Sequence, residues 1–205
     1  MTNLSNILSY LLTENLGLDE EFLEIANYPE GFDIEELKSK RTFAEKARYL
    51  AKFRLRKLGK GSGRAVFKAD KNTVIKVAMN DKGIAQNKIE IKISQDTPDD
   101  APIAKVKDYD PDGIWIESEK ARKANVEDFE NIIGSLHHPS KGMHFWQSIP
   151  YIYNVIKIAR KYNMSYGDLS KTNSWGVINR NGTDLLVLVD YGLDMDVWKQ
   201  HYAKA

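Results

Sequence analysis

Three short strands joined by tight turns are the feature of this sequence that most restricts its fold. Residues 53–60, 64–69 and 73–78 each have the composition of a short strand. Gly-Ser-Gly separates the first two strands, and Asp-Lys-Asn separates the second from the third. Connections of this length and composition are typical of hairpins. Any fold for this chain therefore has to contain a hairpin-rich unit.

Helical patterns lie on both sides of these strands. Apolar residues at helical spacing predict a first helix over 4–12 and a second, short helix over 19–26. A third helical run, rich in Lys and Arg, begins near Asp33. Beyond the strands the pattern predicts a helix over 83–95, strands over 103–109 and 113–119, helices over 126–133 and 145–163, and a closing hairpin of strands 175–179 and 184–190. A strand-rich half followed by a helix-rich half predicts an α+β fold.

The composition excludes several classes of protein. Of the 205 residues, 42% are hydrophobic, which is enough for a core, and the net charge is only +1. This balance gives no overall attraction to nucleic acid or to a membrane surface, so we expect neither as a partner. The absence of cysteine excludes a disulfide scaffold, a thiolate nucleophile and a cysteine-based zinc site. No signal peptide or membrane span is predicted, and we expect a cytoplasmic protein.

The basic run over 33–52 has two interpretations. Its Lys and Arg residues either form the solvated face of an amphipathic helix or provide a surface for a protein partner or a polyanion. The sequence leaves both open.

The strand-rich half contains residues suited to binding phosphate. Its first turn is a cluster of small residues, Gly59, Gly61, Ser62 and Gly63. Glycine allows backbone N–H groups to approach an anion closely. Lys76 lies in the third strand between β-branched neighbours, and Glu90 on the following helix is placed to face it. Each feature alone also has a plainer explanation: a tight turn, a surface lysine and an exposed helix glutamate.

A second group of polar residues lies near the C-terminal end. Asp168 and Asn173 follow the predicted helix 145–163, and Asp190 ends an apolar strand in the tripeptide Asp-Tyr-Gly. The oxygens of Asp190 and Asn173 are ligands of the kind that a hard cation prefers. Asp168 would remain free to orient or deprotonate a hydroxyl group.

The order of these features resembles the signature set of the protein-kinase-like superfamily. A glycine-rich hairpin, a strand lysine, a helix glutamate, Asp-x4-Asn and Asp-aromatic-Gly follow one another over about residues 53–192. The stretch 74–90 is similar to short kinase-like proteins of bacteria and their phages. The stretch 166–169, Tyr-Gly-Asp-Leu, is similar to the loop of small-molecule kinases of the aminoglycoside type.

The resemblance implies a two-lobed fold. Residues 53–120 would form an N-lobe of antiparallel sheet plus one helix, and residues 121–205 a minimal, truncated helical C-lobe. Residues 1–52 would form an N-terminal helical extension.

The resemblance also implies that the chain binds ATP and magnesium. The small-residue turn would cover the phosphates, and Lys76, held by Glu90, would contact them. Adenine would bind the backbone of a hinge near Glu117 and Glu119. The metal ligands would be Asn173 and Asp190, and the catalytic residues would be Asp168 and Lys171 together with Lys76.

The chain departs from the family pattern at several positions. Arg64 stands where glycine is usual, and it either adds a phosphate contact or blocks closure of the loop. Lys171 lies three residues after Asp168 instead of two. Only 13 residues follow Gly192, too few for an activation segment and a large helical subdomain. We hypothesise that the N-terminal helices support the catalytic loop in their place.

The expected function is therefore an ATP- and magnesium-dependent phosphotransferase that moves the γ-phosphate to a hydroxyl of an unidentified small molecule or protein. One alternative is a catalytically inactive kinase-like module that binds nucleotide or protein. Another is a nucleotidyl transferase, because the same fold can bind ATP in the opposite direction.

Overall fold

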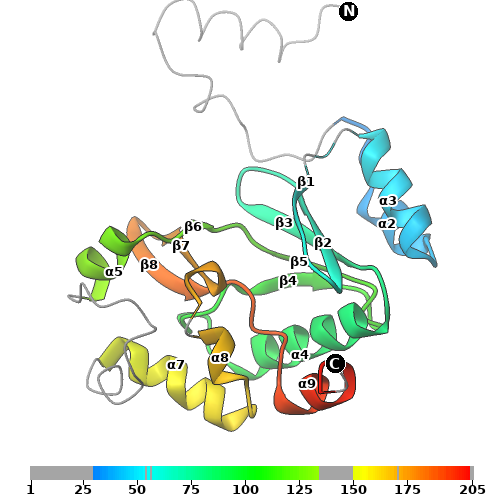
Figure 1. Cartoon of the computed structure of the whole chain (residues 1–205). Helices are drawn as coiled ribbons and strands as arrows, with labels where there is room; N and C mark the ends of the chain where they lie inside the picture. The colour runs from blue at the N-terminus through cyan, green and yellow to red at the C-terminus, as the bar shows by residue number, and fades with distance from the viewer. Residues whose placement is uncertain (1–29, 54, 56, 134–149, 170, 204–205) are drawn as a thin grey trace, which may run out of the picture.

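The fold combines α-helices with antiparallel β-sheets, as the sequence predicts (Figure 1). The computed structural model describes residues 30–53, 55, 57–133, 150–169 and 171–203. The two helical runs expected before residue 30 lie outside these residues, as does the first part of the helix expected over 145–163. In the described part of the chain, no helix is both long enough and apolar enough to cross a membrane.

The larger sheet has five strands, and all of its neighbouring pairs are antiparallel. Their spatial order is β1 (Lys57–Lys60), β2 (Arg64–Lys68), β3 (Thr73–Ala78), β5 (Trp115–Glu119) and β4 (Val106–Tyr109). The central strand β3 is buried along its whole length. β4 begins later than predicted, because Ile103 instead forms a bridge to Leu188 in a second sheet.

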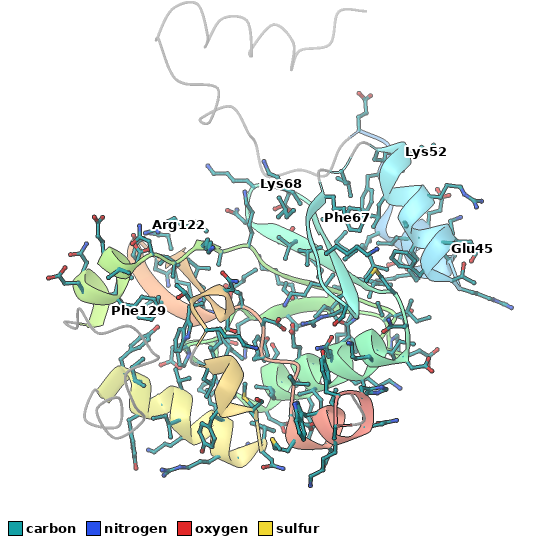
Figure 2. All side chains as sticks on the ribbon, in the orientation of Figure 1. Glu45, Lys52, Phe67, Lys68, Arg122 and Phe129 are labelled. Atoms are coloured by element: carbon teal, nitrogen blue, oxygen red, sulfur yellow. The ribbon has the colours of Figure 1, made fainter. Side chains whose placement is uncertain are left out.

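Two helices cover one face of this sheet, and we call it the α2–α3 face. Leu37 of α2 (Ile34–Ser39) and Leu50 of α3 (Phe43–Lys52) pack with sheet residues such as Ile75. Phe67 belongs to the same core and lies between the sheet and these helices (Figure 2). The N-terminal part of the described chain is therefore bound to the sheet by apolar contacts.

The prediction of one continuous helix from Asp33 is wrong. Asp33 caps α2 by accepting a hydrogen bond from the backbone N–H of Glu35. Thr42 and Glu45 then form a reciprocal capping box that starts α3, since each side chain accepts a hydrogen bond from the backbone N–H of the other. These two start signals divide the run into two helices.

Two expectations about the N-terminal helices need correction. α2 and α3 pack on the five-stranded sheet and not on the segment 166–173, where the sequence placed the expected catalytic loop. The basic run also does not form one solvated face, because Lys46 is fully buried and donates to the carbonyl of Leu37 at 2.9 Å. Lys38 is paired with Glu35 and Asp108. The positive charge available to a partner on 33–52 is correspondingly smaller than the sequence indicates.

The second core joins helix α4 (Asp81–Asp96) to a three-stranded sheet. That sheet consists of β6 (Arg122–Lys123), β7 (Trp175–Arg180) and β8 (Thr183–Leu188). Helices α5 (Val126–Ile133) and α7 (Pro150–Lys161) pack on it, and the shared core includes Ile93, Phe129, Ile156, Trp175 and Leu188. β6 is not among the predicted strands.

The closing hairpin forms as predicted. Arg180 pairs with Thr183, and the turn between them has positive φ at Asn181 (54°) and Gly182 (83°). Positive φ at both central residues is what a type I′ turn requires, and Asn-Gly adopts it most readily. β7 and β8 are therefore held in a fixed register.

Short elements that the sequence analysis treated as loop or tail complete the fold. The polar segment before β7 contains α8 (Tyr166–Leu169) and a 3₁₀ helix, η3 (Thr172–Ser174). After β8, Asp194 caps a further helix, α9 (Met195–His201), by accepting two backbone hydrogen bonds. α9 lies against α4 (Figure 1).

Candidate functional site

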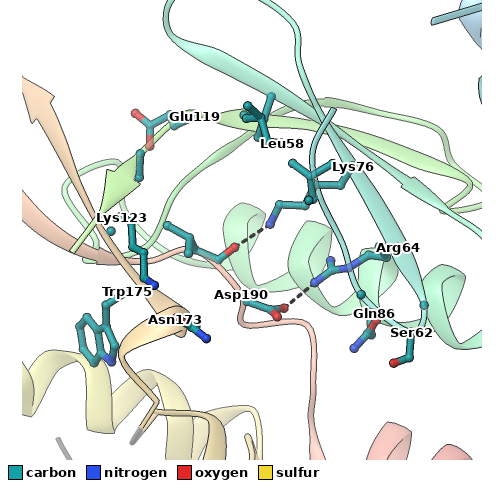
Figure 3. Close-up of a pocket in the computed structure, with 18 of the residues that line it drawn as sticks. Leu58, Ser62, Arg64, Lys76, Gln86, Glu119, Lys123, Asn173, Trp175 and Asp190 are labelled. Atoms are coloured by element: carbon teal, nitrogen blue, oxygen red, sulfur yellow. Dashed lines mark hydrogen bonds and ion pairs between the residues drawn. The ribbon is translucent and has the colours of Figure 1, made fainter. Parts of the chain in front are cut away.

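A cleft lined by residues of both sheets is the candidate functional site (Figure 3). Its volume is about 460 Å³, within the usual range for small-molecule sites. The β1–β2 hairpin, β3 and α4 contribute one part of its lining, and the segments 119–123, 173–176 and 189–190 contribute another. Tyr202, just after α9, also lines it. Residues that are far apart in the sequence therefore meet in this cleft.

Lys76 and Glu90 form a buried ion pair beside the cleft. The Nζ atom of Lys76 lies 2.6 Å from Oε2 of Glu90 and 2.7 Å from the carbonyl oxygen of Val189. The Glu90 side chain is fully buried. Burial lowers the pKa of Lys76 below its ordinary value, the charge of Glu90 opposes this, and the charge of Arg64 adds to the lowering. The structure thus places the strand lysine and the helix glutamate as the sequence indicates.

Arg64 joins this pair to Asp190. Its Nη1 lies 2.7 Å from Oε1 of Glu90, and its Nη2 lies 2.5 Å from Oδ1 of Asp190. Burial acts to lower the pKa of Arg64, but the charges of Glu90 and Asp190 outweigh this effect, and the pKa is raised. Two cations, Lys76 and Arg64, therefore share two carboxylates at the back of the cleft. The sequence marked Arg64 as unusual but did not indicate this contact.

The small-residue turn is docked on the start of α4. The carbonyl of Gly63 accepts from the backbone N–H of Met79 at 2.8 Å, and the hydroxyl of Ser62 accepts from Nζ of Lys82 at 2.7 Å. A Cβ atom on Gly83 would lie 2.1 Å from the carbonyl oxygen of Gly63. Gly63 and Gly83 are therefore required for close packing of the turn against the helix, which explains a glycine at position 63 without reference to a ligand.

Asp190 and Asn173 lie at the same cleft. The side chain of Asp190 is 59% exposed in spite of its ion pair, and Asn173 is also exposed. Among the described residues, no group of three or more His, Cys, Asp or Glu side chains is arranged to hold a metal ion. Magnesium is usually bound by one or two protein carboxylates together with substrate phosphates. One carboxylate and one amide at an open cleft fit that mode of binding.

A hydrogen bond at Tyr191 and close packing at Gly192 anchor the Asp-Tyr-Gly tripeptide. Tyr191 is buried and donates from its hydroxyl to the carbonyl of Ala104 at 2.7 Å. A Cβ atom on Gly192 would lie 2.5 Å from the carbonyl oxygen of Gln86, so the chain passes directly over α4 at this point. This packing sets the backbone position of Asp190 relative to α4, the helix that carries Glu90.

The segment that contains Asp168 is anchored by its neighbours. The backbone N–H of Ser165 donates to Leu193 at 3.1 Å, and the indole of Trp175 donates to the carbonyl of Leu169 at 2.8 Å. Asp168 lies in α8, but its side chain is outside what the structure describes. Lys171 is exposed and is not part of the cleft lining. Residues 193–195 therefore contact the chain just before Asp168, a role that the sequence analysis gave to the N-terminal helices.

Of the two residues named for the hinge, Glu119 lines the cleft and Glu117 does not. Glu117 pairs with Ile75 in the sheet, so its side chain lies on the α2–α3 face, opposite to Lys76. Glu119 lines the cleft, but its carboxylate binds Arg180 at 2.6 Å and its N–H donates to Lys105 at 2.9 Å. The cleft edge instead continues through Ala121 to Lys123.

Sequence reasoning missed further residues at the cleft. Trp175 and Gly176 of β7 line it, and Gly176 allows close approach because a Cβ atom there would lie 2.6 Å from Cβ of Ala121. Tyr202 belongs to a segment for which no element was predicted. Gly176, the second residue of β7, was a possible signal, since glycine within a strand often marks a close approach.

No protein-family model matches the chain, and a search of curated proteins also finds no match.

Proposed function

We propose that this chain has a two-lobed protein-kinase-like fold and transfers the γ-phosphate of ATP, with magnesium, to a hydroxyl group. One observation carries the proposal. The buried Lys76–Glu90 pair and the Asp190 carboxylate, 100 or more residues away in sequence from both, are linked in one cleft by Arg64. Such a lysine, glutamate and aspartate at one cleft are the parts that a kinase uses to position ATP phosphates.

The electrostatics of the cleft support binding of a phosphate chain. Lys76 and Arg64 supply positive charge at its buried end, and Glu90 keeps Lys76 in place. Asp190 and Asn173 would hold magnesium, which neutralises charge on the phosphate oxygens when bound. Val66 and Val74 supply apolar lining for a base.

The acceptor in this proposal is a hydroxyl of a small molecule or of a protein. Asp168, close in sequence to Asn173, would orient that hydroxyl or accept its proton. The exposed Tyr166 precedes it, at the position where the related loops carry histidine.

Release of labelled phosphate from γ-³²P-ATP tests the proposal without knowledge of the acceptor, because water can serve as one. We expect magnesium-dependent release by the unaltered chain and at least about a hundredfold slower release by Lys76→Met and Asp190→Ala. Lys57→Met, an exposed position on β1, is the matched control. Release that is unchanged in both site variants contradicts the proposal, as does label from α-³²P-ATP on the protein, which indicates nucleotidyl transfer.

A second candidate is a nucleotide- or protein-binding module without turnover. The specific observation in its favour is the Arg64–Asp190 pair, which engages the carboxylate that would hold magnesium. Nucleotide binding without release of labelled phosphate, even with a range of hydroxyl acceptors, would favour this candidate.

A further inference from the structure

Arg64 occupies a position from which it can control access to Asp190. It is the first residue of β2, next to the turn that is docked on α4, and its side chain is only 8% exposed. The guanidinium group donates through Nη1 to Glu90 and through Nη2 to Asp190. Asn87 accepts a third, longer hydrogen bond of 3.3 Å from Nη1. The group is therefore fixed at one end by α4 and reaches Asp190 with the other.

The two ends of this guanidinium differ in environment. Glu90 is fully buried and also bound by Lys76, so its contact with Arg64 is enclosed in protein. Asp190 is 59% exposed and faces the cleft. Exposed ion pairs are weak compared with buried ones, because water competes for both charges. The contact between Nη2 and Asp190 is accordingly the one that can be exchanged.

A divalent cation at Asp190 would compete with Arg64 for the negative charge of this carboxylate. The Nη2 atom donates to Oδ1 in a charge-assisted hydrogen bond. A cation at Oδ1 would also stand close to the positive guanidinium and be repelled by it. The positive guanidinium on Oδ1 therefore opposes loading of a cation on Asp190, and release of Nη2 favours it.

We propose that Arg64 is the resident counter-ion of Asp190 and competes with divalent metal for it. Release of Nη2 leaves Nη1 on Glu90 and turns a positive group toward the cleft, where an anionic phosphate oxygen is a suitable new partner. The exchange conserves charge pairing: the Arg64–Asp190 contact is replaced by contacts of Asp190 with metal and of Arg64 with phosphate. The phosphate part of this inference rests on the proposed function, whereas the competition for metal does not.

Metal binding in the absence of nucleotide tests the competition directly. Mn²⁺ is a suitable probe because it prefers oxygen ligands and its free ion is measured by electron paramagnetic resonance. We expect Arg64→Gln to bind Mn²⁺ at least about threefold more tightly than the unaltered chain, since the competing charge is removed. The gain should disappear in Arg64→Gln/Asp190→Asn. Lys57→Gln, which removes a positive charge from exposed β1, should leave the affinity unchanged.

An affinity for Mn²⁺ that is equal or weaker in Arg64→Gln overturns the inference. Arg64→Met serves as a second variant if Arg64→Gln does not fold, because it also removes the competing charge and places an unbranched apolar chain at this buried position. It should also bind Mn²⁺ more tightly than the unaltered chain, and an unchanged affinity in this variant also overturns the inference. The proposed function is tested separately by phosphate release, so failure of one proposal is distinguishable from failure of the other.

Discussion

At the scale of single residues, the buried cluster around Glu90 is the part of the molecule where charges decide stability. Glu90 has no solvent exposure and is bound by both Lys76 and Arg64. Arg64 has Asp190 as a second partner, and Lys76 also donates to the carbonyl of Val189. Removing one charge of a buried pair costs much more than removing an exposed one, because the partner is left buried without compensation.

Glu90→Gln should therefore lower the free energy of unfolding by about 3 kcal/mol. Urea denaturation measures this directly. The matched control is Glu36→Gln, which removes the charge of an exposed pair with Lys40 and should change stability by less than about 1 kcal/mol. Equal losses of unfolding free energy in the two variants would show that the buried charges around Glu90 do not stabilise the protein more than an exposed pair does.

The sequence could predict part of this cluster but not all of it. Lys76 and Glu90 are 14 residues apart on adjacent elements. Periodicity allowed them to face each other, and the family resemblance implied that they pair. Arg64 and Asp190 are 126 residues apart, and no local pattern relates them. The face of the sheet on which Glu117 lies follows from its pairing with Ile75, and only the structure shows this pairing.

At the scale of elements, the contact between the β1–β2 turn and α4 depends on two glycines. Glycine within a helix normally costs about 0.5–1 kcal/mol relative to alanine. At Gly83 we expect the opposite, that alanine is less stable than glycine. The added Cβ would lie 2.1 Å from the carbonyl oxygen of Gly63, a backbone atom that cannot rotate away.

We predict that Gly83→Ala destabilises the protein by about 2 kcal/mol, as overpacked sites do. Thermal or urea unfolding is the measurement. Gly59→Ala is the control, since no atom lies within 4 Å of the added Cβ. A stabilised Gly83→Ala variant would mean that the turn is not docked on α4 as described.

Turn and capping residues mark where several helices and strands begin or end. The Asn-Gly turn placed the β7–β8 hairpin correctly. Asp33 and Thr42 are residue types that often cap helices, and together they indicate two helix starts within the basic run. β6, by contrast, is only two residues long and exists because it pairs with β7, a contact that sequence alone does not indicate.

At the scale of the whole molecule, two apolar cores surround the cleft. One joins α2 and α3 to the five-stranded sheet, and the other joins α4, α5 and α7 to the three-stranded sheet. The cleft is lined by residues of both sheets. Loss of the first core should therefore affect the sheet that carries Lys76.

Leu50→Ala tests the contribution of that core. Leu50 is fully buried between α3 and the sheet, and we expect a loss of about 2–5 kcal/mol of unfolding free energy. Leu58 is 45% exposed, so Leu58→Ala should cost less than about 1 kcal/mol. If Leu50→Ala is as mild as this control, α3 is dispensable for the stability of the sheet.

The most direct test of the central claim is thermal unfolding with and without ATP and Mg²⁺, for the unaltered chain and for Asp190→Ala. At 100 times its Kd, a ligand stabilises by about 2.7 kcal/mol, which raises the Tm of a chain of this size by roughly 5–10 °C. The account predicts a shift that requires magnesium and is lost in Asp190→Ala, each variant being compared with its own ligand-free Tm. No shift in the unaltered chain, or an equal shift in Asp190→Ala, would contradict the claim that this cleft binds ATP with magnesium.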